Sequence, residues 1–388
     1  MKLIFVSNYF NHHQQPMSDR LYELCKQNQG SYVFMQTEAM EEERIRMGWG
    51  EVFQNTPYLK NYWEDPEGCQ KMIDEADAVI FGGTDEECYI QNRLRKGAPI
   101  WRYSERLYKT GRYKFVSPRG LHKKFLDHTR YGKSRVYLLC AGAYVAGDFR
   151  LVLAYPGKKY RFGYFPKCKQ YEWNALAEGK SSNKSGKITL FWAARMIDWK
   201  HPEAVLELAA ELKKSGYVFN VLMAGGGEME EEMHRLAEKL QVTDVVTFLG
   251  NQNPDNVRRI MEESDIYLTT SDSGEGWGAV INEAMNSGCA VVANKSMGAA
   301  PYLIKHGENG MLYRNGHGEE LVACVKTLIE NQKMREEMGK AAYDTISGMW
   351  NADVAGERLF DCIRAELTGR STVEYKEGPM SKETLMKG

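Results

Sequence analysis

Short apolar runs alternate with amphipathic stretches along most of the chain, and the alternation falls into two series. The apolar runs of the first series cover residues 3–7, 32–36, 78–81, 99–101 and 137–139, with amphipathic stretches at 18–27 and 68–76. Those of the second series cover residues 188–192, 219–223, 245–249, 266–270 and 290–293, with helical patterns at 202–215 and 229–240. Because strands that alternate with helices form parallel sheets, two α/β domains are expected.

A polar stretch rich in glycine and serine, residues 179–186, separates the two series. It has no apolar periodicity, which is typical of a linker. The 388 residues are also too many for one simple core. We therefore expect an N-terminal domain at 1–170, a linker at 171–186 and a C-terminal domain at 187–349.

The two ends of the chain predict different behaviour. Residues 350–367 are amphipathic and predict a final helix that packs back on the N-terminal domain, whereas residues 368–388 predict a frayed polar tail. The first apolar run has only four residues, which predicts a strand and not a signal peptide. No apolar run reaches the roughly 18 to 20 residues that a membrane-spanning helix needs. These features predict a cytoplasmic protein, and eight scattered cysteines without a C-x-x-C pair predict buried thiols.

Charge is distributed unevenly along the chain. The 51 basic and 52 acidic residues nearly cancel, which argues against a chain that coats nucleic acid. Residues 1–170 nevertheless hold 27 basic and 19 acidic side chains, a net +8, against 24 and 33, a net −9, in the remainder. The basic excess concentrates at 93–169. A solvated helix face explains any single run, but the asymmetry of a whole domain predicts contact with an anionic membrane surface or a lipid-diphosphate acceptor.

Residues 271–285 carry the most informative motif, Ser-Asp-Ser-Gly-Glu-Gly-Trp-Gly-Ala-Val-Ile-Asn-Glu-Ala-Met. They follow a predicted strand, so the glycines lie where a strand turns into a helix. A helix N-terminus offers unpaired backbone N–H groups, and Gly276 and Gly278 let a ligand approach closely. Glu275 and Glu283 are eight residues apart, about two turns of a continuous helix. The motif predicts a pocket for a phosphate or a polar sugar.

Two further strand-to-helix loops fit the same pocket. Arg195 and Lys200 follow the strand predicted at 188–192, and a guanidinium and an ammonium there would neutralise the charge of a departing diphosphate. Two surface cations beside a helix start are the alternative. The glycine turn at 225–227 follows the next strand, and Phe248-Leu249-Gly250 follows one helix later. The turn lacks G-x-G-x-x-G, which weakens a dinucleotide interpretation.

These motifs resemble retaining nucleotide-sugar glycosyltransferases of family 4, the glycosyl transferases group 1, over most of residues 186–367. The resemblance implies an α/β protein with the GT-B fold, two Rossmann-like domains facing across a cleft. It also implies that Arg195 and Lys200 stabilise the leaving diphosphate, that Glu283 binds the ribose and that Glu275 binds the sugar. The donor-binding residues it implies are Gly225, Gly226, Leu249, Gly250, Gly276, Trp277, Gly278, Ala279 and Glu283. His201 departs from the family pattern, which usually has glycine after the lysine.

No two aspartates are separated by one residue, so the Asp-x-Asp metal site of the other major glycosyltransferase fold is missing. We expect no metal and no cofactor, with the nucleotide sugar as a substrate. The acceptor is expected at the N-terminal domain, where Asn8, His12 and His13 follow the first predicted strand. Ser104 or Glu105 replaces a family histidine that touches the donor sugar. A surface pair of Glu105 with its neighbour Arg106 is the alternative.

The sequence thus predicts a retaining, metal-independent glycosyltransferase that moves a sugar from a UDP- or GDP-sugar to a glycan or lipid-linked acceptor in polysaccharide or glycoconjugate assembly. It would be cytoplasmic, peripheral at the inner face of the membrane, and would not bind nucleic acid. One alternative is a sugar phosphorylase or nucleotide-sugar epimerase on the same fold, which would share the Arg, Lys and Glu constellation. Another is a catalytically silent subunit that binds nucleotide sugars.

Overall fold

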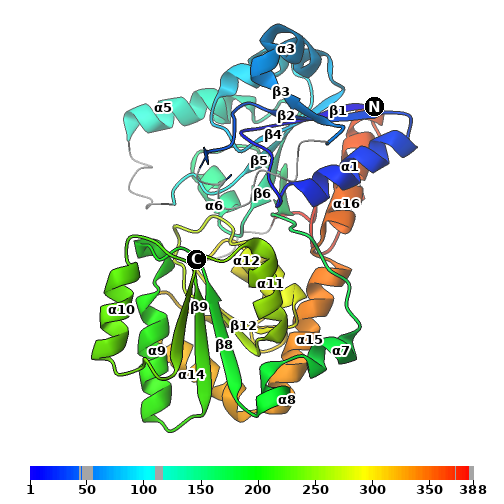
Figure 1. The fold of residues 1–388 in the computed structure, drawn as a ribbon. Coiled ribbons are helices and arrows are strands. Elements are labelled where there is room, and N and C mark those ends of the chain that lie inside the picture. The colour runs from blue at the N-terminus through cyan, green and yellow to red at the C-terminus, as the bar shows by residue number, and fades with distance from the viewer. Residues whose placement is uncertain (43–44, 46–55, 110–116, 372, 384–388) are drawn as a thin grey trace. The chain divides into compact units, whose positions relative to one another are not determined.

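The computed structural model describes residues 1–42, 45, 56–109, 117–371 and 373–383. The chain divides into two compact units (Figure 1). Unit 1 comprises Met1–Lys167 with Asn351–Gly388, and unit 2 comprises Cys168–Trp350. Each unit has its own sheet and its own core, and each is described by itself.

The described residues of unit 1 form a seven-stranded sheet in the order β3-β2-β1-β4-β5-β6-β7. The strands are β1 (Lys2–Ser7), β2 (Ser31–Gln36), β3 (Leu59–Asn61), β4 (Ala78–Gly82), β5 (Ile100–Ser104), β6 (Val136–Ala141) and β7 (Lys159–Phe162). All neighbours are parallel, and β1 pairs with β2 from Lys2 opposite Ser31 to Ser7 opposite Gln36. The central strand β4 is buried along its whole length, because helices cover both faces of such sheets.

The helices of unit 1 connect these strands. They are α1 (Gln15–Gln27), α3 (Pro66–Glu75), α4 (Gln91–Lys96), α5 (Pro118–Asp127), α6 (Val145–Leu151) and α16 (Ala352–Thr368), with 3-10 turns at Tyr62–Glu64, Glu87–Ile90 and Thr129–Tyr131. Helix α3 starts at a proline, and the Asp65 side chain accepts a hydrogen bond from the Gly68 N–H at 3.0 Å, which caps it. Helix α16 packs on α1 within unit 1.

Residues 380–383, part of the predicted frayed tail, instead pair with the sheet of unit 1. Residues 380–383 run antiparallel along β7, with the Met380 N–H donating to the Arg161 carbonyl at 2.8 Å and the Arg161 N–H donating to the Ser381 carbonyl at 2.9 Å. Met380 and Ser381 are almost fully buried. The edge strand β7 offers unpaired backbone groups, and pairing with them orders a segment that is polar in sequence.

The helices and strands of unit 2 all lie in the described part of the chain. Its strands form a six-stranded sheet in the order β10-β9-β8-β11-β12-β13. The strands are β8 (Ile188–Ala193), β9 (Phe219–Ala224), β10 (Val246–Gly250), β11 (Ile266–Thr269), β12 (Ala290–Asn294) and β13 (Met311–Tyr313). All neighbours are parallel. The chain reverses its direction of travel across the sheet between β8 and β11, and open α/β sheets bind ligands at the carboxyl edge beside such a point.

The helices of unit 2 are α7 (Trp173–Glu178), α8 (Ser181–Ser185), α9 (Glu203–Lys214), α10 (Glu230–Lys239), α11 (Pro254–Glu263), α12 (Val280–Asn286), α13 (Ala300–Leu303), α14 (Gly318–Glu330) and α15 (Gln332–Gly348), with a 3-10 turn at Asp198–Lys200. Alternate residues of β8, Leu190 and Trp192, point into a core that α9 covers through Val205 and Leu212. The period of two in the strand and the apolar face of the helix produce this packing.

The predicted linker at 171–186 is a folded part of unit 2. It forms α7 and α8, and the Lys180 ammonium is buried between the carbonyls of Ser287, at 2.6 Å, and Met261, at 3.1 Å. The prediction is wrong because it rested on polar composition, whereas here tertiary hydrogen bonds satisfy the polar groups. The break between the units along the chain lies between residues 167 and 168.

The cysteines are free thiols, and five of them are buried. Cys88 is exposed, contrary to the prediction, and Cys168 and Cys324 are half-buried. Among the described residues, every helix is too short or too polar to cross a bilayer.

Candidate functional site

The candidate site is built from the loops at the carboxyl ends of β8, β9, β10 and β11 in unit 2. Parallel strands bring their carboxyl ends to one edge of the sheet, so loops far apart in sequence meet there. Tyr267 of β11 illustrates the connection, since its hydroxyl donates to the carbonyl of Ala193 at the end of β8, at 3.1 Å.

Arg195 follows β8 and is the exposed cation of the site. The structure gives its guanidinium no hydrogen-bond or ion-pair partner within the described ranges, and it lies 5.8 Å from the ring centroid of Trp199. An aromatic face holds a guanidinium without using its N–H groups. Those N–H groups remain available to an anionic ligand.

Lys200 and Glu275 form an ion pair between the β8 and β11 loops. Both side chains are largely buried. Two backbone contacts hold the same loops together: the Asp272 N–H donates to the Trp199 carbonyl at 3.0 Å, and the Thr270 hydroxyl donates to the Lys200 carbonyl at 2.5 Å. The pair places a positive and a negative group side by side, suited to a ligand with an anionic part and a hydroxyl-bearing part.

His201 is a second bridge between these loops. Its Nδ1 lies 2.8 Å from a Glu203 carboxylate oxygen and its Nε2 lies 3.4 Å from Asp272. The hydrogen bond to Glu203, together with the charges of both carboxylates, raises the pKa of His201 to about 9 despite burial. The residue has φ +48°, a left-handed conformation in which glycine is more usual. The two ion pairs that protonated His201 forms, beside Lys200, thus offset the strain of its left-handed backbone.

The glycine turn after β9 lets two loops approach closely. A Cβ at Gly225, φ +123°, would lie 1.9 Å from the Ala194 carbonyl oxygen, and one at Gly227, φ +152°, would lie 2.5 Å from that of Met196. The backbone of the turn also binds the β8 loop, because the Met196 N–H donates to the Gly226 carbonyl at 2.8 Å. The immediate role of these glycines is to seat the loop that carries Arg195.

The segment 276–279 joins Glu275 to α12. Helix α12 begins at Val280, so Glu275 lies in the loop before it, and the glycines lie where the chain passes from strand to helix, as the sequence predicts. Gly278 has φ +92°, and a Cβ there would lie 2.5 Å from the Met297 methyl group. Trp277 is 1% exposed and donates to Asn282 at 2.9 Å, so its side chain belongs to the core. The backbone of Gly276, Trp277, Gly278 and Ala279 is what this segment offers to a ligand.

Glu283 lies in the first turn of α12 and is half-buried. Its carboxylate has no hydrogen-bond partner among the described residues. Burial raises the pKa of Glu283 above its ordinary value, while the charge of Arg258 acts in the opposite direction. A ligand that donates hydrogen bonds to this carboxylate would offset the free-energy cost of burying its charge.

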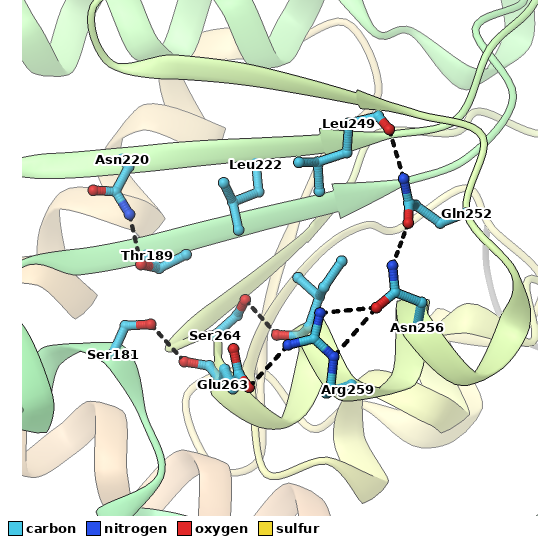
Figure 2. Close-up of a pocket in the computed structure, with 11 residues that line it drawn as sticks. Ser181, Thr189, Asn220, Leu222, Leu249, Gln252, Asn256, Arg259, Glu263 and Ser264 are labelled. Carbon is cyan, nitrogen blue, oxygen red and sulfur yellow. Dashed lines mark hydrogen bonds and ion pairs between the residues drawn. The ribbon is translucent and has the colours of Figure 1, made fainter.

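Leu249 and Gly250 end β10, where a bulge interrupts the pairing with β9. The Leu249 carbonyl accepts a hydrogen bond from Gln252 at 2.5 Å, and the Gly250 carbonyl accepts one from Gly225 at 2.8 Å. Leu249 also lines a cavity of about 380 Å³ along α11 (Figure 2). Polar side chains that line this cavity hydrogen-bond to one another; for example, the Asn220 amide donates to the Thr189 hydroxyl at 2.7 Å. Leu249 is the predicted site residue that lines the cavity.

Asn8, His12 and His13 follow β1 in unit 1 and are all half-buried. The Asn8 carbonyl accepts hydrogen bonds from the N–H groups of Thr37, at 2.8 Å, and Glu38, at 2.9 Å. The two imidazoles lie against each other with ring centroids 3.9 Å apart, and burial lowers the pKa of His12 to about 4. His12 is therefore neutral at physiological pH, a hydrogen-bonding group and not a cation.

Ser104 ends β5 and Glu105 follows it, and their polar groups have partners within unit 1. The Ser104 hydroxyl donates to the Glu105 carbonyl at 2.9 Å. The Glu105 carboxylate pairs with Lys109 and accepts from the Tyr164 hydroxyl at 2.9 Å. The alternative pair with Arg106 is wrong, because Arg106 lies 3.4 Å from Asp148. Glu105 is thus held by neighbours within unit 1, and its contact with a donor sugar stays a prediction.

Three residues of the site escaped the sequence motifs. His201 and Asp272 clamp the loops, and Trp199 supports Arg195. The histidine gave a signal, since it occupies a position where glycine is usual. Asp272 lies inside the quoted motif but has no partner visible in sequence, and Trp199 is an ordinary aromatic residue until the fold places it under a guanidinium. Within the described ranges, no group of three or more His, Cys, Asp or Glu side chains is arranged to hold a metal ion.

Comparison with known proteins shows which family and which relatives this chain resembles. Residues 176–345 match the family model described as glycosyl transferases group 1. An uncharacterized glycosyltransferase of Haemophilus influenzae is 31% identical over 40% of this chain and 44% of its own length. A GDP-mannose-dependent alpha-(1-6)-phosphatidylinositol monomannoside mannosyltransferase of Mycobacterium tuberculosis is 24% identical over 50% of this chain and 52% of its own. The chain thus spans about half the length of these curated relatives.

Solved structures resemble the chain over nearly its whole length. Anabaena HepE in complex with UDP superposes with a TM-score of 0.70 at 15% identity, covering 94% of this chain and all of that one. The lipopolysaccharide outer core galactosyltransferase WaaB gives a TM-score of 0.69 at 12% identity, with 94% of this chain and all of that one covered. The fold of both is GT-B, and likeness at this identity establishes the fold alone. Residues 176–345 of this chain therefore match the glycosyl transferases group 1 model, and the chain has a two-unit GT-B fold.

Proposed function

We propose that this chain is a retaining glycosyltransferase that moves a sugar from a nucleoside-diphosphate sugar to a glycan or lipid-linked acceptor. One observation carries the proposal: Arg195 and Glu283 are a cation and a half-buried carboxylate without hydrogen bonds or ion pairs among the described residues. They lie at the same edge of a sheet as the Lys200–Glu275 pair, Arg195 in a loop and Glu283 in the first turn of α12. These loops belong to the segment that matches the glycosyl transferases group 1 model.

The proposed donor contacts follow from the charge of each group. Arg195 and Lys200 bind the diphosphate, because a guanidinium and an ammonium are the strongest partners of phosphate oxygens. Glu283 accepts hydrogen bonds from the ribose hydroxyls, which compensates the cost of its burial. Glu275 and the backbone of 276–279 bind the transferred sugar. The turn at Gly225 and Gly226 and the backbone of Leu249 and Gly250 flank the nucleotide.

Transfer proceeds through growth of negative charge on the departing diphosphate. Arg195 and Lys200 stabilise that charge more in the transition state than in the ground state, which lowers the barrier. Lys200 must exchange part of its contact with Glu275 for the phosphate, leaving the carboxylate to the sugar hydroxyls. We place no protein side chain as the base, so the acceptor attacks from the side that the diphosphate leaves and gives its proton to a phosphate oxygen. The sugar keeps its anomeric configuration.

Relatives support the substrate classes that we propose. The mycobacterial relative uses GDP-mannose, and structural neighbours are complexes with UDP and with UDP-glucose, so a GDP- or UDP-sugar is the donor to test first. A Rhizobium meliloti relative acts in lipopolysaccharide core biosynthesis, which favours a glycoconjugate acceptor. Asn8, His12 and His13 of unit 1 are the acceptor contacts that we propose.

The activity test incubates the full chain with a panel of UDP- and GDP-sugars and glycan or lipid-linked acceptors. We expect transfer with one donor, an NMR anomeric signal of retained configuration, and a rate unchanged by EDTA because the two cations replace a metal. Cleavage of a glycoside by inorganic phosphate would favour a sugar phosphorylase, and a change in the free nucleotide sugar would favour an epimerase. Wild-type protein that binds a donor but transfers it to no acceptor of the panel would favour a binding subunit, and an Arg195→Ala variant with wild-type turnover and nucleotide affinity would contradict the proposal.

A further inference from the structure

Helix α5 of unit 1 turns its apolar side chains away from the protein. Leu121 and Phe125 are one turn apart, on one side of the helix, and are 37% and 51% exposed. No residue of α5 is buried. An ordinary surface helix has the opposite arrangement, with its apolar side on the core. Figure 1 shows α5 at the periphery of unit 1.

The side of α5 that contacts the protein is polar. Lys123, Lys124 and Asp127 line a small cavity with Arg102, and the Asp127 carbonyl accepts a hydrogen bond from Arg102 at 2.9 Å. Lys123 also donates to the Asp127 carboxylate at 2.9 Å. The orientation of the helix is therefore fixed by polar contacts, and the exposure of its apolar side is a built feature of unit 1.

A second apolar projection lies near the end of α5. Leu151 and Leu153 are 37% and 77% exposed in the turn after α6. The Thr129 hydroxyl, just beyond α5, donates to the Val152 carbonyl at 2.6 Å, so this turn is attached to the end of the helix. Leu153 has φ +52°, and this left-handed backbone holds an apolar side chain outward.

The structure also separates the basic residues of 93–169 into two groups. One group is used inside unit 1: Arg93 binds backbone carbonyls, Arg102 pairs with Glu87 at 2.6 Å, Arg106 with Asp148, and Arg135 with Glu366 at 2.6 Å. The second group consists of exposed side chains on α5, on the turn that follows it and at the end of α6, namely Arg119, Arg130, Lys133 and Arg150, whereas Lys123 is paired with Asp127 within α5. Arg95, Lys96 and Lys167 are exposed elsewhere in this stretch, so part of the positive charge left for a partner lies around the apolar projections.

We propose that this surface, formed by Leu121, Phe125, Leu151 and Leu153 with the four basic side chains around them, docks on an anionic lipid bilayer. Apolar tips enter the boundary between head groups and acyl chains, and basic side chains attract anionic head groups. A second copy of the chain fits poorly, because a two-fold contact would set the same positive charges against each other. The inference goes beyond the proposed function and does not depend on the donor site.

The experiment is co-sedimentation of the full chain with vesicles of phosphatidylcholine alone or mixed with phosphatidylglycerol, at low and high salt. We expect binding to the anionic vesicles that weakens with salt, because a charged surface is screened. Leu121→Ser with Phe125→Ser is expected to weaken binding roughly tenfold. Arg119→Gln and Arg130→Gln are each expected to weaken it roughly fivefold.

Matched controls come from exposed residues of unit 2. Val218→Ser and Lys333→Gln replace side chains that are 69% and 83% exposed, and both are expected to bind vesicles like the wild type. Circular dichroism checks that each variant keeps the wild-type melting temperature. Binding that ignores anionic lipid and salt, or a double serine variant that binds like the wild type, would overturn the proposal. The proposal would also be overturned if the wild type did not bind vesicles and was a dimer that the double serine variant converted to a monomer. That result would assign the surface to contact with a second copy.

Donor hydrolysis in the absence of vesicles is measured on the same proteins. A double serine variant that hydrolyses donor normally but releases vesicles supports the docking surface alone. Wild-type protein that binds vesicles but no nucleotide would count against the proposed function and leave the docking surface standing.

Discussion

Charged side chains in the loops after the strands are paired differently in the two units. In unit 2, the Arg195 guanidinium and the Glu283 carboxylate have no hydrogen bond or ion pair among the described residues, and Lys200 is paired with Glu275 across two loops. In unit 1, Glu105 is held by Lys109 and Tyr164, and Arg106 by Asp148. Charges that satisfy one another stabilise a fold, whereas buried or clustered charges left without partners are suited to a ligand. The difference supports the proposal that unit 2 binds the charged part of a nucleotide sugar.

The largest effect is expected from Arg195→Ala. Turnover with the nucleotide sugar should fall roughly 100- to 1000-fold, as when a group that stabilises transition-state charge is lost. The melting temperature should change little, because the side chain is exposed and its cation–π contact with Trp199 is worth about 1 kcal/mol or less at the surface. Arg235→Ala, an exposed arginine on α10, is the matched control and should keep full turnover. Equal losses in both variants would remove the special role of Arg195.

Glu283→Gln should weaken donor binding roughly 10- to 100-fold, the loss of a hydrogen bond to a charged group. It should also raise the melting temperature. A carboxyl whose pKa is raised in the folded state destabilises the fold as pH rises above its unfolded value, and glutamine removes that term. KM measurements and melting curves at acidic and neutral pH test both signs. A lower melting temperature with an unchanged KM would make Glu283 a structural residue.

His201→Asn should remove a pH-dependent contribution to the free energy of unfolding, while asparagine tolerates the left-handed backbone at this position. The folded pKa of about 9 lies above the ordinary 6.5, so the stabilisation is fully present below pH 6.5 and is lost as pH rises through 9. Partial exposure limits it to about 1 kcal/mol. The difference in unfolding free energy between wild type and variant should therefore disappear between pH 6.5 and 10. His317→Asn, at an exposed histidine of unit 2, is the control, and a difference that is constant with pH would contradict the role of His201.

The smallest effect on the donor is expected from Glu105→Gln in unit 1. Loss of its contacts with Lys109 and Tyr164 should lower stability by about 1 kcal/mol or less, since the ion pair is partly exposed. The donor KM should remain that of the wild type. A KM raised as much as in Glu283→Gln would mean that the proposed contrast between the units is wrong.

Apolar runs located the long strands because a buried parallel strand is apolar along its length, as Val79 and Ile80 of β4 are. The same reasoning brought Arg195, Lys200, Glu275 and Glu283 to one region, since each follows a strand of the same sheet. Strands of three or four residues, such as β3, β7 and β13, carry too few residues for a period to appear.

Long-range pairing explains most of what sequence patterns missed. Lys180 is buried because the carbonyls of Met261 and Ser287 receive its ammonium, and Met380 because β7 offers a free edge. Neither partner is near in sequence. The bridge from His201 to Asp272 and the Lys200–Glu275 pair likewise join residues about 70 positions apart, so only the fold reveals that the donor loops are clamped together.

The most direct test of the account is calorimetric titration of UDP and GDP into the wild type, Arg195→Ala and Glu105→Gln. The account predicts that one nucleotide binds the wild type, binds Arg195→Ala at least roughly tenfold more weakly, a loss of about 1.4 kcal/mol, and binds Glu105→Gln with unchanged affinity. Equal affinity for the wild type and Arg195→Ala, or a loss confined to Glu105→Gln, would contradict the assignment of the diphosphate to unit 2.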